Sequence, residues 1–87
     1  MNIFEKYKLY KHVMKQRPYF TTGYSDKKNY NIFYLNYSTD DCLVDIFFDR
    51  KIKKYNATVI QSKKVSAYFK SSFFAKKLFN HGIDIWK

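Results

Sequence analysis

The sequence predicts a single small α+β domain, in which an antiparallel sheet carries an N-terminal and a C-terminal helix. Three observations lead to this fold class. The chain has 87 residues, the length of one domain. Both ends show helical periodicity, and the middle holds short runs of aromatic and β-branched residues separated by polar turns. The expected order is α-β-β-β-β-α over residues 1–87, without an internal boundary.

Residues 3–16 are expected to form the first helix. Asn2 precedes them and is a suitable N-cap. Apolar side chains then recur at helical spacing along one face, with a stripe of lysines beside it. Pro18 disfavours helical geometry at the residue before it, so the helix should end near Gln16.

Residues 19–24 are expected to form the first strand, and residues 30–37 and 42–49 the two strands of a hairpin. A polar turn, residues 38–41, joins the hairpin strands. Because side chains alternate along a strand, the second run has an apolar core face and a mixed face. The core face is Cys42, Val44, Ile46 and Phe48; the mixed face is Asp41, Leu43, Asp45, Phe47 and Asp49. The first run is apolar on both sides, which predicts a central strand with cover on each face.

Residues 55–61 are expected to form the last strand, followed by a second helix. This helix should begin at Ser62 or Lys64 and end near His81, because a broad apolar arc appears on a helical wheel. Gly82 is placed to end it as the C′ residue. If both helices cover one face of the sheet, the mixed face of residues 41–49 should be half exposed.

Positive charge is the strongest signal in the composition. Seventeen Lys and Arg against seven Asp and Glu give a formal net charge of +10 and a pI near 9.7. Nucleic acid, an acidic protein surface or anionic lipid would suit such a chain. An AT-rich genome would also enrich lysine, asparagine, phenylalanine and tyrosine. The basic residues of the C-terminal half are the candidate binding residues for nucleic acid or another partner: Arg50, Lys51, Lys53, Lys54, Lys63, Lys64, Lys70 and Lys77.

The expected order of helix, strands and helix, with Ser62-Lys63-Lys64 opening the second helix, is similar to the double-stranded-RNA-binding domain. The resemblance implies that the lysine pair holds phosphates across a groove. This chain departs from that family in an additional strand, in the absence of glycines before the pair, and in Tyr68 and Phe69, where the family has small residues. The similarity is therefore an analogy. Aromatic side chains between the cations would also allow stacking on unpaired bases.

Two other functions compete with nucleic-acid binding. Asp49-Arg50-Lys51 is a D-x-K sequence at a strand end, which together with Asp41, Asp45 and Glu5 would suit a magnesium-dependent nuclease. Exposed aromatics beside cations would equally suit protein binding. In that case the chain would be a phage or mobile-element accessory protein that inhibits a host protein or nucleoprotein machine, for example an anti-CRISPR.

No catalytic, metal or cofactor site is expected from the spacing of residues. His12 and His81 stand alone in the sequence, and the single cysteine, Cys42, falls on a core face without a nearby histidine. No apolar run is long enough to cross a membrane, which predicts a cytoplasmic protein. The sequence therefore favours a non-enzymatic binding protein associated with nucleic acid, with the host-directed inhibitor as the alternative.

Overall fold

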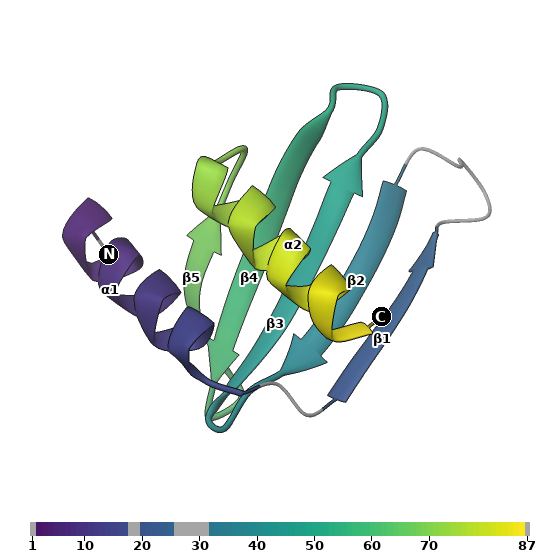
Figure 1. Ribbon diagram of the computed structural model, residues 1–87. Helices are drawn as coiled ribbons and strands as arrows, with labels where there is room; N and C mark the ends of the chain where they lie inside the picture. The colour runs from purple at the N-terminus through teal and green to yellow at the C-terminus, as the bar shows by residue number, and fades with distance from the viewer. Residues whose placement is uncertain (1, 18–19, 26–31, 87) are drawn as a thin grey trace.

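The structure is a computed structural model that describes residues 2–17, 20–25 and 32–86 (Figure 1). Side chains are described from residue 2 to 17 and from 32 to 84. The elements are α1 (Ile3–Lys15), β1 (Phe20–Ser25), β2 (Ile32–Ser38), β3 (Cys42–Asp49), β4 (Lys54–Gln61), β5 (Lys64–Phe69) and α2 (Phe73–Trp86). Three residues of the predicted strands, Tyr19, Tyr30 and Asn31, lie outside the described part.

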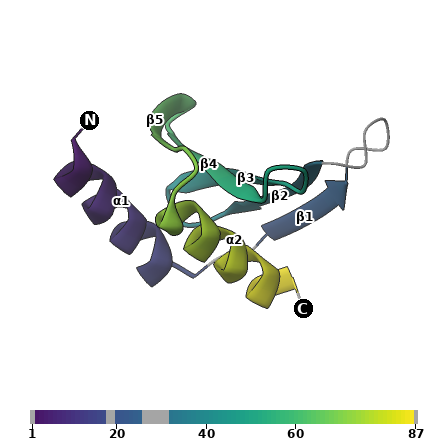
Figure 2. The same cartoon turned by 90° about the horizontal axis from the view of Figure 1, so that it is seen from above.

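The strands form one antiparallel sheet in sequence order, β1-β2-β3-β4-β5. Both helices lie on the same side of this sheet, as the view from above shows (Figure 2). Helix α2 crosses the face of the sheet, and α1 lies beside α2 near β5 (Figure 1). The predicted fold class, an antiparallel sheet with an N-terminal and a C-terminal helix packed on it, is confirmed.

A fifth strand, β5, occupies the place predicted for the start of the second helix. Ser62 and Lys63 form the tight β4–β5 turn with φ angles of 51° and 64°. Such two-residue turns usually contain Asn-Gly or Asp-Gly, so the sequence carries no turn signal here. Helix α2 begins only at Phe73, where the Ser72 hydroxyl accepts a hydrogen bond from the Ala75 backbone N–H at 3.1 Å. The predicted helix start was therefore wrong. Lys63 and Lys64 do not open a helix, so the analogy to the RNA-binding family loses its support.

Helix α2 also continues past Gly82, which was predicted to end it. A Cβ atom on Gly82 would lie 2.5 Å from Leu35 Cδ2 and 2.8 Å from the Tyr37 ring. The glycine therefore lets the helix approach β2 closely, a packing requirement that the sequence pattern does not reveal. Tyr37 is buried here, and its hydroxyl donates to the Leu78 carbonyl at 3.1 Å.

The core lies between the sheet and the helices. Val44 and Ile46 of β3 are fully buried, as the predicted core face requires. Aromatic rings complete the core, since Tyr55 stacks on Phe48 with 4.4 Å between centroids and meets Phe79 of α2 at 5.2 Å. The expectation that β2 is covered on both faces was wrong, because both helices lie on one side. Within the described residues, neither helix has the length and apolar character of a membrane span.

Candidate functional site

The face of the sheet turned away from the helices, called the open face below, carries polar and aromatic side chains in cross-strand rows. Strand register places Tyr34, Phe47 and Asn56 in one row and Asn36, Asp45, Thr58 and Tyr68 in the next. A third row contains Ser38, Leu43, Ile60 and Val65. The mixed face predicted for residues 41–49 therefore belongs to a surface that spans at least four strands.

Three aromatic rings lie on the open face. Tyr34 and Phe47 lie opposite each other on β2 and β3, with 5.9 Å between ring centroids. Tyr68 of β5 is 61% exposed, whereas its neighbours Ala67 and Phe69, which point to the covered face, are buried. A hollow of about 300 Å³ lies between these strands and is lined by Phe47, Asn56, Ala57, Thr58, Tyr68, Phe69 and Lys70. Flat rings at an open hollow are suited to stacking against another planar group.

The candidate basic residues fall into separate groups. One group, called the basic end below, lies at the end of the sheet where β3 and β5 finish and contains Arg50, Lys51, Lys53, Lys54 and Lys70. Lys70 belongs to it because β5 ends opposite Ala57, and the adjacent Ser71 N–H donates to Asn56 Oδ1 at 3.0 Å.

Lys63 and Lys64 lie at the other end of β4, in and after the β4–β5 turn. At about 3.3 Å per residue, this places them roughly 25 Å from the basic end. Lys77 lies on α2, where its Nζ is 5.2 Å from the centroid of the Phe73 ring. The structure thus brings together the basic end but neither the Lys63–Lys64 pair nor Lys77.

The D-x-K sequence has a structural role in the β3–β4 turn. Asp49 Oδ1 accepts hydrogen bonds from the backbone N–H groups of Lys51, at 2.9 Å, and Ile52, at 3.3 Å. Asp41 lies at the opposite end of β3, so these two carboxylates are not brought together. Between them, Asp45 lies beside Asn36 on the open face, and partial burial raises its pKa above the ordinary value. The carboxylates proposed for a nuclease therefore form no cluster among the described residues.

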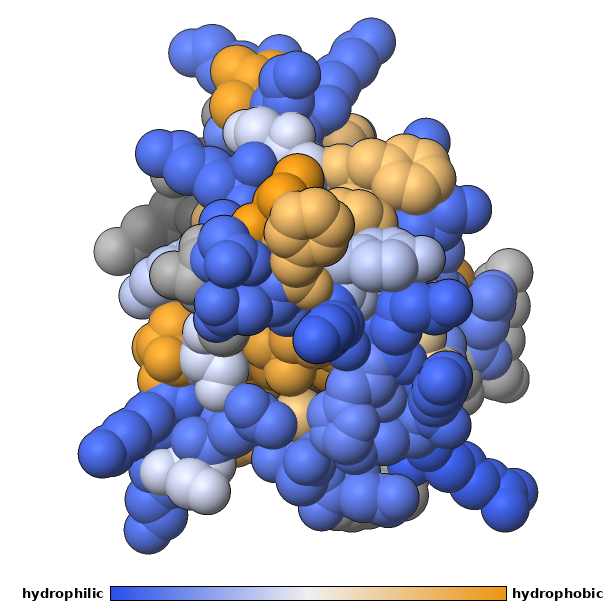
Figure 3. Space-filling view, turned by 90° about the vertical axis from the view of Figure 1, so that its left-hand side faces the viewer, coloured by the Kyte–Doolittle hydropathy of each residue, from blue (hydrophilic) through white to orange (hydrophobic). Residues whose placement is uncertain are grey.

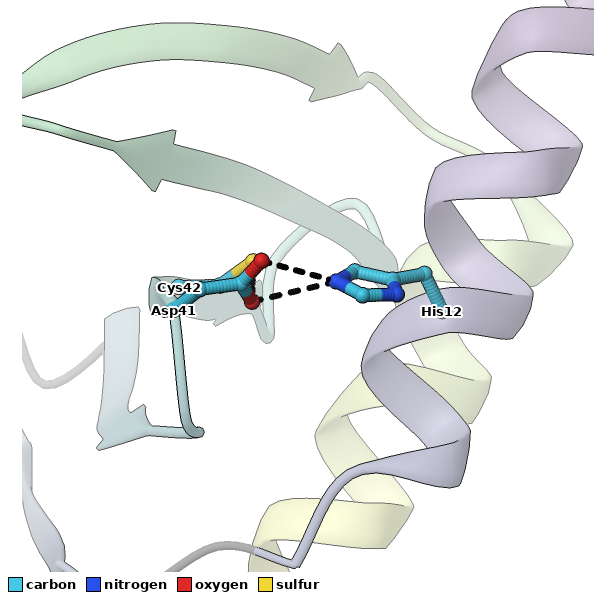
Figure 4. A group of neighbouring side chains, drawn as sticks. All are labelled: His12, Asp41 and Cys42. Carbon is cyan, nitrogen blue, oxygen red and sulfur yellow. Dashed lines mark hydrogen bonds and ion pairs between the residues drawn. The ribbon is translucent and has the colours of Figure 1, made fainter.

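A different cluster joins α1 to the β2–β3 turn (Figure 4). His12 Nε2 lies 2.9 Å from Asp41 Oδ2 and 3.1 Å from Oδ1, although the two residues are 29 positions apart. Cys42 Sγ lies 3.1 Å from Asp41 Oδ1, and Gln16 Nε2 lies 2.6 Å from the same oxygen. The expectation that Cys42 has no nearby histidine was therefore wrong, since the ligand atoms of His12 and Cys42 lie within 4.8 Å of each other. No sequence spacing could reveal these contacts, because they depend on how α1 docks against the sheet.

The electrostatics of this cluster follow from its hydrogen bonds and its burial. The side-chain hydrogen bond from His12, reinforced by those from Cys42 and Gln16, holds the pKa of the Asp41 carboxyl well below its usual range. Burial, with the neighbouring Asp41 carboxylate second, raises the pKa of the Cys42 thiol to about 11. At neutral pH the thiol is therefore protonated and the carboxylate ionised.

Apolar side chains also gather on the side of the molecule that carries α1. Figure 3 shows this side as hydrophilic over most of its area, around a smaller group of apolar residues. Ile3 is 68% exposed and Phe73 is 65% exposed, and both line a hollow of about 240 Å³ together with Lys6 and Lys70. This surface, called the helix-end patch below, is the natural place for a protein partner if the chain acts as an inhibitor.

Comparison with known proteins adds no relative to this description. No family model, no curated protein and no solved structure matches the chain.

Proposed function

We propose that the chain is a non-enzymatic protein that binds single-stranded nucleic acid on its open face. The observation that carries the proposal is the combination on one surface of Tyr34, Phe47 and Tyr68 with the basic end of the sheet. Aromatic rings on an open sheet stack on unpaired bases, and flanking cations hold the phosphates between them. The net charge of +10 supplies the long-range attraction.

The geometry favours unpaired strands over a duplex. Tyr34 and Phe47 lie on the inner strands β2 and β3 and Tyr68 lies on the edge strand β5, whereas the cations follow the ends of β3 and β5. A duplex presents phosphates outward and keeps its bases stacked inside, so it would leave these rings without a partner. A single strand can place splayed bases on the rings while its backbone passes the basic end.

Paired charge removal tests this proposal. Lys54→Gln with Lys70→Gln removes two positive charges from the basic end, and Lys63→Gln with Lys64→Gln removes two from the opposite end. The two variants have the same net charge, so they differ only in where the charge is lost. Affinity for short single-stranded DNA and RNA would be measured by fluorescence anisotropy across a salt series.

Each phosphate contact contributes about 0.7 to the slope of log affinity against log salt for a single strand. The Lys54/Lys70 variant should therefore lose about 1.4 from the slope, and about 10- to 25-fold in affinity near 0.1 M salt. The Lys63/Lys64 variant should change affinity by less than about twofold. Equal losses in both variants, or wild-type binding weaker than about 10⁻⁴ M at physiological salt, would contradict the proposal.

The alternative function, inhibition of a host protein, is favoured by the helix-end patch. It predicts a stoichiometric complex with one host protein that survives nuclease treatment and moderate salt. A pull-down from host lysate, with and without nuclease, separates the two functions. Substitution of Phe73, which is 65% exposed in this patch, would then abolish capture.

A further inference from the structure

The cluster of His12, Gln16, Asp41 and Cys42 plays no part in the proposed nucleic-acid surface. Its polar atoms come from two elements and point toward one another (Figure 4). The histidine nitrogen, a carboxylate oxygen and the cysteine sulfur all lie within 4.8 Å of each other.

The protons of the cluster cannot satisfy all of its close contacts. His12 Nε2 faces the Asp41 carboxylate, which only accepts, and also the Gln16 amide nitrogen at 2.7 Å, which only donates. If Nε2 carries a proton, that proton points at the N–H of the Gln16 amide. If Nε2 carries no proton, its lone pair points at the Asp41 carboxylate. Gln16 Oε1 is buried and has no partner among the described residues. A cation between these atoms removes the conflict, because every lone pair would then point at positive charge.

We propose that His12, Asp41 and Cys42 bind one divalent transition-metal ion of the zinc type. Imidazole nitrogen, carboxylate oxygen and thiolate sulfur are the ligands that zinc uses in proteins. Thiolate disfavours magnesium and calcium, which prefer oxygen ligands. A half-turn of the Gln16 amide places its unpartnered oxygen beside Asp41 Oδ1 as a fourth ligand.

The local charge fits such an ion, and the geometry fits it after small shifts of the three ligand side chains. Tetrahedral bonds of about 2.0–2.3 Å place ligand atoms about 3.3–3.7 Å apart. The separations in the structure, 2.9 and 3.1 Å for neighbouring pairs and no more than 4.8 Å overall, lie on both sides of that spacing. One carboxylate and one thiolate neutralise the divalent charge, and the thiol proton leaves on binding. His12 and Asp41 are both exposed, so solvent reaches two of the three ligands.

Metal binding would join α1 to the sheet, because His12 lies on α1 and the other two ligands lie at the start of β3. The ion should therefore stabilise the fold as well as occupy the site. At a free metal concentration of 100 times Kd, linkage predicts a rise in melting temperature of about 10–20 °C for a domain of this size.

The test uses reduced, metal-free protein titrated with zinc and, separately, with cobalt(II). We expect one ion per chain, the stated rise in melting temperature, and a thiolate-to-cobalt charge-transfer band. His12→Gln, at an exposed position, should weaken affinity by at least about tenfold, and Cys42→Ser should remove the band. His81→Gln and Asp40→Asn are matched controls outside the cluster and should bind like the wild type.

Three results would overturn the proposal. One is the absence of the charge-transfer band in the wild type at saturating cobalt. Another is a zinc affinity for His12→Gln equal to that of the wild type, since the variant retains the fold and lacks only one ligand. Equal loss of affinity in His81→Gln would likewise show that the histidines bind metal without a built site.

Discussion

The two faces of the sheet are made by the same strands but have opposite characters. On the covered face, Leu35, Val44, Ile46 and Val59 are all fully buried beneath the helices. On the open face, Leu43 of β3 is 53% exposed and Tyr68 of β5 is 61% exposed. Alternation of side chains explains how one strand supplies both faces.

Packing explains the apolar residues of the covered face but not the aromatic residues of the open face. Burial accounts for every apolar residue of the covered face, because each contributes to a close-packed core. No such account applies to Tyr34, Phe47 and Tyr68, which lie on the face without helices. One exposed and two half-buried aromatic rings beside a group of cations are a surface feature, and this contrast is the basis of the proposed function.

The largest expected effect comes from placing the same charge on each face of β3. Ile46→Asp should cost at least about 3 kcal/mol or unfold the domain, because an unpaired carboxylate would enter the core. Leu43→Asp, on the open face, should change the free energy of unfolding by less than about 0.5 kcal/mol. Urea denaturation of both variants measures the difference, and similar losses would mean that the faces are assigned incorrectly.

A smaller effect tests how closely α2 approaches the covered face. Gly82→Ala should destabilise the domain by about 1–2 kcal/mol, because overpacking against the buried Leu35 and Tyr37 outweighs the better helix propensity of alanine. Asn80→Ala, at an exposed position of the same helix, should be neutral or slightly stabilising. Stabilisation by Gly82→Ala would show that α2 does not pack against β2 at this distance.

The smallest effect concerns the turn that brings β5, and with it Tyr68, into the open face. Lys63 has a φ of 64°, a left-handed conformation that glycine adopts without strain. Lys63→Gly should therefore stabilise the domain by about 0.5–1 kcal/mol. If residues 62–69 were helical, as the apolar arc suggested, the same substitution would destabilise by about 1 kcal/mol. The sign of the change in thermal stability decides between the two.

Much of the fold was predictable because local patterns agree with the final contacts. The alternation in residues 42–49 gave the correct faces, and the Asn2 side chain accepts a hydrogen bond from the Glu5 N–H at 2.9 Å, as an N-cap does. The β5 segment was misassigned because a strand of six residues after a turn without glycine also fits a helical wheel. Its buried residues, Ala67 and Phe69, do show the two-residue period of a strand.

The candidate site was less predictable, because it depends on contacts between distant segments. The sequence indicated which residues are basic, but only the length and register of β4 separate Lys54 from Lys63 by a full strand. The His12–Asp41 contact spans 29 positions and requires the docking of α1. Likewise, the exposure of Tyr68 follows from β5 being a strand, which the predicted helix obscured.

The most direct test of the nucleic-acid proposal compares two exposed aromatic residues, one on each side of the molecule. Tyr68 on the open face is 61% exposed and Phe73 at the start of α2 is 65% exposed, so neither substitution should disturb the core. A base stacked on an aromatic ring contributes about 1–3 kcal/mol, so Tyr68→Ala should weaken binding to a single-stranded oligonucleotide by about 5- to 150-fold. Phe73→Ala should leave that affinity unchanged. An unchanged affinity in Tyr68→Ala, or a loss in Phe73→Ala alone, would contradict binding on the open face.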